Sequence, residues 1–219
     1  MKIKDLLPIS ASIQYLAQLK GIPVTTGYKI ARLQTQTVNA LAPFEKIRTE
    51  MAAQFMKPGT NSLKEGVNGE EVNKSFLELL DSETDFTPPT NPIISLRDIP
   101  VGTKIVPSYL SAIYGNLLFV VDTDELPKEI PIPDQQTLIN LFNGYVSLGN
   151  MEIEVENALT SMILDGLKAI HSAMLVSGTE GFPPPDFKIG LQVIPLSLLE
   201  KLGSVPAQTL SSLMPVIRE

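Results

Sequence analysis

The chain has 219 residues, of which 43% are hydrophobic and 19% charged, a composition typical of one globular domain or two small ones. Its net charge of −7 argues against a protein that covers nucleic-acid phosphates, and the absence of cysteine excludes disulfides, thiolate metal sites and a cysteine nucleophile. The apolar stretches are too short or too interrupted to cross a bilayer, and no apolar run of signal-peptide length follows Lys4, so we expect a soluble protein.

The N-terminal part of the chain predicts two helices. Apolar residues recur at helical spacing from Leu6 to Leu19, and Gly21 ends that pattern. A long amphipathic helix is predicted over roughly 26–56, and Pro43 is expected to kink it. Its core-facing positions repeat every seven residues in two lines, which are Ile30, Thr37, Phe44 and Met51, and then Leu33, Ala40 and Ile47.

Shorter elements are predicted over the next part of the chain. Val72, Phe76 and Leu79 or Leu80 share one face of a helix predicted over 70–82. The remaining predictions are a loop over 57–67, short strands over 93–96 and 103–106, a short helix over 107–115 and a buried extended segment over 117–121.

The C-terminal part again predicts helices. Asp134 is the expected N-cap of one helix, and a second, longer helix is predicted over 150–176. The later predictions are a strand over 188–194 with Ile189, Leu191 and Val193 on one side, and two short helices after it. The fold class is therefore mainly α with a few short β strands (α+β), as two helical hairpins and a small sheet. We expect an N-terminal half over 1–126, a linker over 127–134 and a C-terminal half over 135–219.

The two halves have a similar order of elements. Residues 98–113 and 193–213 both start with Ile-Pro and later carry Val-Pro followed by a Leu-Ser pair. A degenerate tandem duplication would explain this, and coincidence among residues that commonly start helices is the alternative.

Asp122 and Asp124 follow the apolar run 117–121 and are the strongest candidates for chemistry. Two carboxylates at the end of a strand can hold Mg²⁺ against a phosphate. The fragment resembles the first motif of the haloacid-dehalogenase-like phosphatases. It departs from that motif at Leu126 and Pro127, and few strands are predicted after it. We favour a polar turn that leaves the core, and predict no metal site.

Two other features carry possible metal ligands. Every second residue from 152 to 156 is a glutamate, namely Glu152, Glu154 and Glu156. On a strand they would share one face, but we expect them to spread around the start of a helix. His171 is the only histidine, and its neighbour Ser172 in a helix has the wrong geometry for a catalytic pair. The sequence therefore predicts no catalytic, cofactor-binding or metal-binding residues.

Both ends of the chain carry a set of helix-building motifs. They are a short opening helix over 1–7, a helix start followed by a Phe-Glu-x-x-Arg motif, and a C-terminus that contains Leu and Pro. The residues after the opening helix are Pro23, Val24, Thr26, Tyr28, Lys29, Ile30, Ala31, Arg32, Leu33, Phe44, Glu45 and Arg48, then 194–199, Pro206, Leu210, Leu213, Pro215 and Ile217. In these motifs the chain resembles small uncharacterised helical proteins of tailed bacteriophages and prophages, over about the first 60 residues and about the last 25, while residues 115–185 have no counterpart. The resemblance implies a phage origin rather than an activity.

The leading functional hypothesis is a non-enzymatic phage structural or assembly protein of the capsid, neck, tail or baseplate. Its expected partners are other copies of itself and other phage structural proteins, with no nucleic acid, membrane or cofactor. We expect it in the virion, and in the host cytoplasm during assembly. The alternatives are a phage-encoded intracellular binding protein, such as an inhibitor of a host defence factor, and a metal-dependent enzyme built on Asp122 and Asp124.

Overall fold

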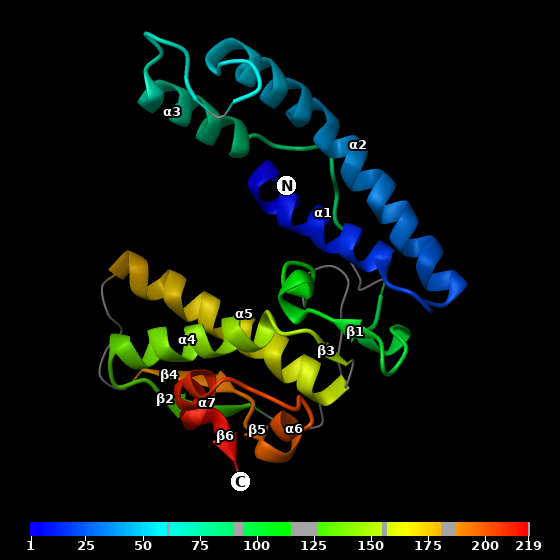
Figure 1. The fold of residues 1–219 in the computed structure, drawn as a ribbon, viewed down its shortest axis with the longest axis vertical. Coiled ribbons are helices and arrows are strands. Elements are labelled where there is room, and N and C mark those ends of the chain that lie inside the picture. The colour runs from blue at the N-terminus through cyan, green and yellow to red at the C-terminus, as the bar shows by residue number, and fades with distance from the viewer. Residues whose placement is uncertain (61, 90–93, 115–126, 155–156, 181–186, 219) are drawn as a thin grey trace. The chain divides into compact units, whose positions relative to one another are not determined.

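The computed structural model describes residues 1–60, 62–89, 94–114, 127–154, 157–180 and 187–218 (Figure 1). The chain is mainly helical with a few short strands, which confirms the predicted fold class. Its contacts divide it into two compact units, one of residues 1–19 with 24–91 and one of residues 20–23 with 92–219. This division differs from the expected one, because residues 128–131 of the expected linker form a strand that pairs within the second unit.

The first unit is built on two helices. Helix α1 (Ile3–Gln18) packs along α2 (Val24–Phe55). On α1, Leu6, Ile13 and Leu16 are completely buried, as their helical spacing predicts. Helix α2 is continuous through Pro43, and its start and end match the predicted ones within two residues.

The heptad pattern of α2 is buried along only part of the helix. In the first line, Ile30, Thr37 and Phe44 are buried. In the second line Leu33 is buried, but Ile47 is 42% exposed. The core of this unit therefore ends near Phe44, and the last turns of α2 extend beyond it.

Helix α3 (Gly69–Leu80) follows the loop after α2 and contacts both α1 and α2 (Figure 1). Asn68 caps it, because the Asn68 side chain accepts a hydrogen bond from the backbone N–H of Glu70 at 3.0 Å. The chain then returns to α1, where the backbone N–H of Ile3 donates to the carbonyl of Ser82 at 3.0 Å. These bonds close the first unit.

The second unit has a helical layer of α4 (Gln135–Gly149), α5 (Asn157–Glu180) and α7 (Ala207–Leu213). Helix α4 contacts both of the others, and Figure 1 shows α4 and α5 side by side. Asp134 caps α4 as predicted: its carboxylate accepts a hydrogen bond from the backbone N–H of Thr137 at 2.6 Å, which lowers the pKa of Asp134.

The strands of the second unit form three separate pairs among the described residues, where one small sheet was expected. They are the antiparallel pairs β1 (Lys104–Ile105) with β3 (Ile153–Glu154) and β2 (Lys128–Pro131) with β4 (Lys188–Leu191), and the parallel pair β5 (Ile194–Pro195) with β6 (Ile217–Arg218). Strand β4 also contacts α5 and buries Ile189 and Leu191, as their alternation predicts. The short helical elements of this unit are Leu96–Asp98, Pro107–Leu110, α6 (Leu196–Glu200) and Met214–Val216.

The prediction of a helix from residue 150 was wrong. Residues 153–154 form β3, and α5 begins at Asn157. Ile153 is 2% exposed and pairs with the completely buried Ile105, so burial of this strand pair replaces the first helical turn. As a result Glu154 lies on a strand opposite Lys104, and the Glu152 carboxylate pairs with the Lys104 ammonium at 3.2 Å.

Two further local predictions need correction. The strand predicted over 93–96 is not seen in its described part, because Ser95 caps a short 3-10 helix over Leu96–Asp98. The segments 98–113 and 193–213, whose similarity motivated the duplication hypothesis, form different elements: 98–113 contains an antiparallel strand and 3-10 turns, and 193–213 contains a parallel strand, α6 and α7.

Candidate functional site

The residues with metal-binding potential in the sequence are not brought together among the described residues. Asp122, Asp124 and Glu156 lie outside the described residues. The other two glutamates of the alternating trio are held at β3, as above, and His171 is exposed on α5. Within the described ranges, no group of three histidine or acidic side chains lies close enough to hold a metal ion.

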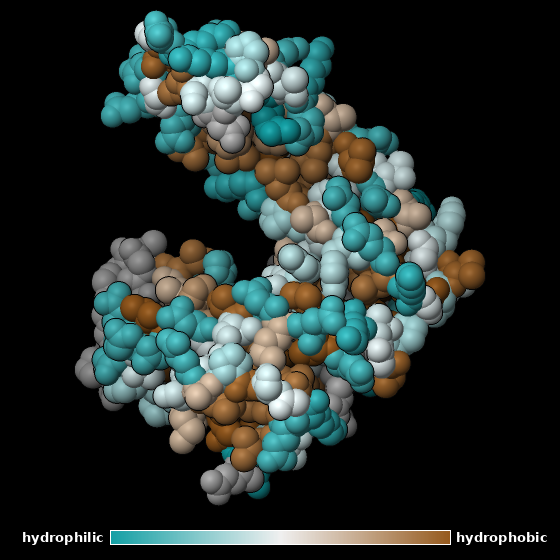
Figure 2. Space-filling model, viewed as in Figure 1, coloured by the Kyte–Doolittle hydropathy of each residue, from teal (hydrophilic) through white to brown (hydrophobic). Residues whose placement is uncertain are grey.

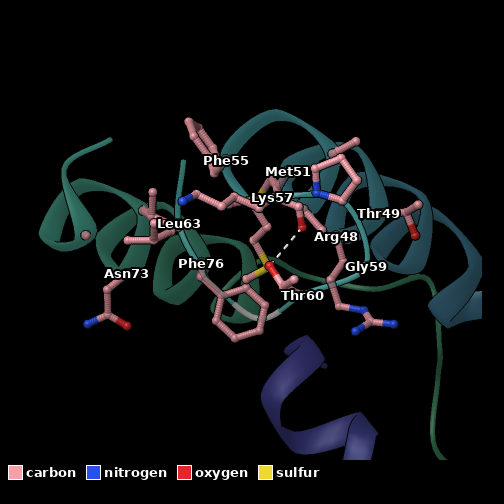
Figure 3. Close-up of a pocket in the computed structure, with 16 residues that line it drawn as sticks. Arg48, Thr49, Met51, Phe55, Lys57, Gly59, Thr60, Leu63, Asn73 and Phe76 are labelled. Atoms are coloured by element: carbon pink, nitrogen blue, oxygen red, sulfur yellow. Dashed lines mark hydrogen bonds between the residues drawn. The ribbon is translucent and has the colours of Figure 1, made fainter. Parts of the chain in front are cut away.

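The first unit contains a groove of about 840 Å³ between the end of α2, the loop that follows it and α3 (Figure 3). Its large apolar side chains are Met51, Phe55, Met56, Leu63, Val72 and Phe76, all of which are half-buried. Figure 3 shows that α2, the loop and α3 each contribute side chains to it. The groove lies where α2 extends beyond the core of the unit.

The loop wall of the groove is held by backbone hydrogen bonds. Met56 and Leu63 form an isolated antiparallel bridge, and the backbone N–H of Lys57 donates to the carbonyl of Ser62 at 2.9 Å. The Lys64 ammonium donates to the carbonyls of Ala53 and Gln54 at 2.8 and 3.0 Å, which satisfies carbonyls at the end of α2. The groove is therefore an ordered feature of the unit.

Helix α3 is amphipathic, yet none of its residues is buried. Gly69, Val72, Asn73 and Phe76 line the groove at helical spacing. Leu77, next to this stripe, is 54% exposed. Such a face gains stability from burial only when another surface covers it. Figure 2 shows apolar side chains gathered where the helices of this unit meet.

The charge in the groove lining is positive. The lining residues from α2 and the loop include Arg48 and Lys57, and the whole lining contains no acidic residue. The Arg48 guanidinium pairs with Glu45 at 2.7 Å, whereas Lys57 has no acidic partner in the described structure. The exposed Glu70, Glu71, Lys74 and Glu78 of α3 lie outside the lining.

A second polar feature is a row of side chains inside the second unit. The Tyr114 hydroxyl lies 3.3 Å from the Ser161 hydroxyl, which donates to the Asp165 carboxylate at 3.5 Å. Both distances are long for O–H···O bonds, so these bonds are weak. Burial raises the pKa of Tyr114 to about 12. Burial also raises the pKa of Asp165, opposed by hydrogen bonds from Tyr114 and Ser161 and by the charge of Lys168.

The raised pKa of Asp165 predicts a pH effect on stability. At pH values between the pKa of Asp165 in the unfolded chain and its pKa in the folded chain, the native state holds a proton that the unfolded chain has lost. The contribution of Asp165 to the free energy of unfolding is therefore fully present below the unfolded pKa and is lost as pH rises through the folded pKa. Asp165→Asn cannot ionise, so its thermal midpoint relative to wild type should rise between pH 4 and pH 7. Thermal denaturation of both proteins at these pH values measures the difference. An offset that does not change with pH would contradict the assignment.

Tyr145 occupies the contact between α4 and α5. Its side chain is completely buried, and its hydroxyl has no hydrogen-bond partner among the described residues. Burial raises its pKa above the ordinary range. The ring lies directly on Gly166 of α5, because a Cβ placed on Gly166 would come within 1.9 Å of a ring carbon. Gly166 therefore creates the space that the Tyr145 ring fills.

Because the Tyr145 hydroxyl is unpaired, we expect its removal to stabilise the protein, whereas most core substitutions destabilise it. A buried hydroxyl without a partner costs about 1–3 kcal/mol, and phenylalanine keeps the ring that packs on Gly166. Tyr145→Phe should therefore raise the free energy of unfolding by about 1 kcal/mol. Urea denaturation at neutral pH measures it, and a clear loss of stability would mean that the hydroxyl has a partner.

No protein-family model, curated protein or solved structure matches the chain. Within the described residues, none of the helices is both long enough and apolar enough to span a membrane. Within the described residues, the groove bounded by α2, the loop after it and α3 is a surface suited to binding. The row of Tyr114, Ser161 and Asp165 belongs to the second unit, where Tyr114 and Ser161 are buried.

The sequence contained one signal for this groove. The predicted apolar face of α3 included Val72 and Phe76, but that pattern does not show whether the rest of the unit covers the face. Leu77, directly after Phe76, widens the face to one side of the helix. A wide apolar face on a short helix after a long loop was the available indication.

Proposed function

We propose that this chain is a non-enzymatic structural or assembly protein of a tailed bacteriophage that works through protein–protein contacts. The observation that carries the proposal is the apolar face of α3, on which Val72 and Phe76 are only half-buried and Leu77 is 54% exposed. In a folded protein, an apolar face of this kind next to an apolar groove commonly marks an interaction surface.

The phage part of the proposal is supported by the sequence resemblance at the two ends of the chain. In this proposal its partners are further copies of itself and other structural proteins of the particle, and it is located in the virion after assembly in the host cytoplasm. Symmetric assemblies place many copies of one chain in equivalent positions, which suits a small protein that carries an exposed groove.

The test is quantitative mass spectrometry of virions purified by density gradient, with intact particles compared with a lysate of infected cells. Peptides of this chain should co-purify with the particle at a fixed ratio to the major structural proteins. A chain that is abundant in the lysate but absent from purified particles would remove this proposal in favour of an intracellular binding protein. Pull-down from infected cells would then identify that partner.

A further inference from the structure

We propose that the groove of the first unit binds a small anionic amphiphile, with its alkyl chain along the apolar lining and its carboxylate at Lys57. A fatty acid is the simplest molecule of this class. This ligand goes beyond the proposed function, because it adds a small molecule to the protein contacts and does not depend on them. The size, the polar groups and the charge of the groove lining each favour it.

The size and the apolar lining of the groove suit a flexible alkyl chain. Its volume of about 840 Å³ lies within the range of roughly 300–1,000 Å³ that is usual for small-molecule sites. Its large apolar side chains are half-buried, so each still has apolar surface that a ligand can cover. Two of them are Met51 and Met56, and unbranched methionine side chains adapt to the shape of what they contact.

Three polar side chains of the lining are already bonded within the unit. The Thr49 hydroxyl donates to the carbonyl of Glu45 at 2.7 Å, and the Thr60 hydroxyl donates to the carbonyl of Lys57 at 3.2 Å. The Arg48 guanidinium pairs with the Glu45 carboxylate at 2.7 Å. An extended peptide would bring backbone N–H and C=O groups that need partners once they are covered, whereas an alkyl chain has none. The lining therefore favours an alkyl chain over an extended peptide.

The charge of the lining selects the head group of the ligand. Arg48 and Lys57 are its charged residues, and it contains no acidic residue. Because Arg48 already pairs with Glu45, Lys57 is the cation that can meet an anionic head group. A carboxylate beside Lys57 forms an ion pair there, and an ammonium group would be repelled. The lining should therefore distinguish an anionic chain from neutral and cationic chains of the same length.

The first experiment titrates the full chain with decanoate at neutral pH by isothermal titration calorimetry, at concentrations below those at which the ligand forms micelles. We expect a single bound decanoate per chain. Octanoate should bind more weakly and dodecanoate more tightly, by about three- to fourfold for each CH₂ group, because each buried CH₂ adds to the apolar contact. An affinity that does not depend on chain length would overturn the inference.

The head group is tested with chains of equal length. Decanol should bind more weakly than decanoate, and decyltrimethylammonium should bind most weakly of the three. Lys57→Gln should weaken decanoate binding about two- to fivefold, the usual range for one exposed ion pair, and leave decanol binding unchanged. Equal affinities of the three head groups for the wild-type chain would contradict the assignment of Lys57.

Lys74→Gln is the matched control for Lys57→Gln. It removes the same charge from the first unit, but Lys74 is exposed on α3 and lies outside the lining. Its ion pair with Glu78, at 4.0 Å between exposed side chains, contributes little. This variant should bind decanoate as the wild-type chain does, and an equal loss in both variants would mean that only the net charge matters.

Methionine methyl groups report where the ligand binds. In a chain labelled with ¹³C at these groups, decanoate should shift the NMR signals of Met51 and Met56. Met162 is 4% exposed and Met214 is 67% exposed, and both belong to the second unit, so their signals should stay in place. Because Met214 is highly exposed, it also detects unspecific adsorption. Shifts at Met214 without shifts at Met51 and Met56 would place the ligand elsewhere and reject the groove.

Met51→Gln tests the apolar lining directly. Glutamine has a similar length and is also a good helix former, so the helical content by circular dichroism should match wild type. Its amide would be covered by the alkyl chain without a partner, so decanoate binding should weaken at least about fivefold. Binding that Met51→Gln leaves unchanged would show that the chain does not lie on this lining.

A bilayer offers the same chemistry as a free fatty acid, and flotation with phosphatidylglycerol vesicles separates the two sources. We expect the chain to stay out of the vesicle fraction, because the groove takes up a single free chain. Flotation with the vesicles without binding of free decanoate would overturn the inference in favour of a membrane surface. None of these results depends on whether virions contain the chain, so this inference and the proposed function can fail separately.

Discussion

Replacing Gly166 by alanine should destabilise the second unit by about 3 kcal/mol. At an ordinary helical position this substitution stabilises, because glycine costs about 1 kcal/mol relative to alanine in a helix. Here the added Cβ would lie 1.9 Å from a carbon of the Tyr145 ring, and that ring is completely buried. The ring must move into a packed core, which costs more than the helix gains.

Urea denaturation, followed by hydrogen exchange in peptides of α4 and α5, measures this effect. Gly27→Ala is the control, because Gly27 is also helical and an added Cβ there meets nothing within 4 Å. It should raise stability by up to about 1 kcal/mol. Smaller side chains at Tyr145, as in Tyr145→Leu, should reduce the cost of Gly166→Ala, because the two positions are in direct contact. Equal effects of alanine at Gly27 and Gly166 would contradict the packing argument.

The second large effect is expected at Phe44 of α2. Phe44→Ala should lower the free energy of unfolding of the first unit by about 3–5 kcal/mol, because it removes a ring that is 3% exposed and leaves a cavity. Denaturation followed by hydrogen exchange over α1 and α2 measures the loss.

Ile47→Ala gives the control one turn further along the same helix. Ile47 belongs to the same predicted heptad pattern but is 42% exposed. Its truncation should cost less than about 1 kcal/mol, since surface substitutions of this kind have small effects. A similar cost at the two positions would mean that another surface covers the end of α2.

Phe44 and Ile47 also show how far the sequence could predict the fold. Periodicity identified α2 and its apolar side correctly, because helical spacing depends only on local geometry. It could not show where along the helix the core ends, because that depends on the length of α1 and on the turn before α3. The alternating pattern of 152–156 was assigned to a helix because the strand there depends on a distant partner, which local spacing does not show. Its pairing with β1 involves residues about 50 positions away.

The candidate site was predictable only in part. The sequence indicated the amphipathic α3, with Val72 and Phe76 on its apolar face. The groove itself was not predicted, because it requires the loop 57–67 to fold back so that Met56 pairs with Leu63. The space that Gly166 leaves for Tyr145 was likewise not visible, since an isolated glycine in a helical pattern has no local signature of its packing partner.

The strand pairings also determine when each part of the chain can finish folding during synthesis. The first unit needs only residues up to the end of its extended return at 89, because α1, α2 and α3 contact one another. In the second unit β5 pairs with β6, so the last parallel pair cannot form until Arg218 has left the ribosome. Nascent chains should therefore present a finished α3 groove while the rest is still being made.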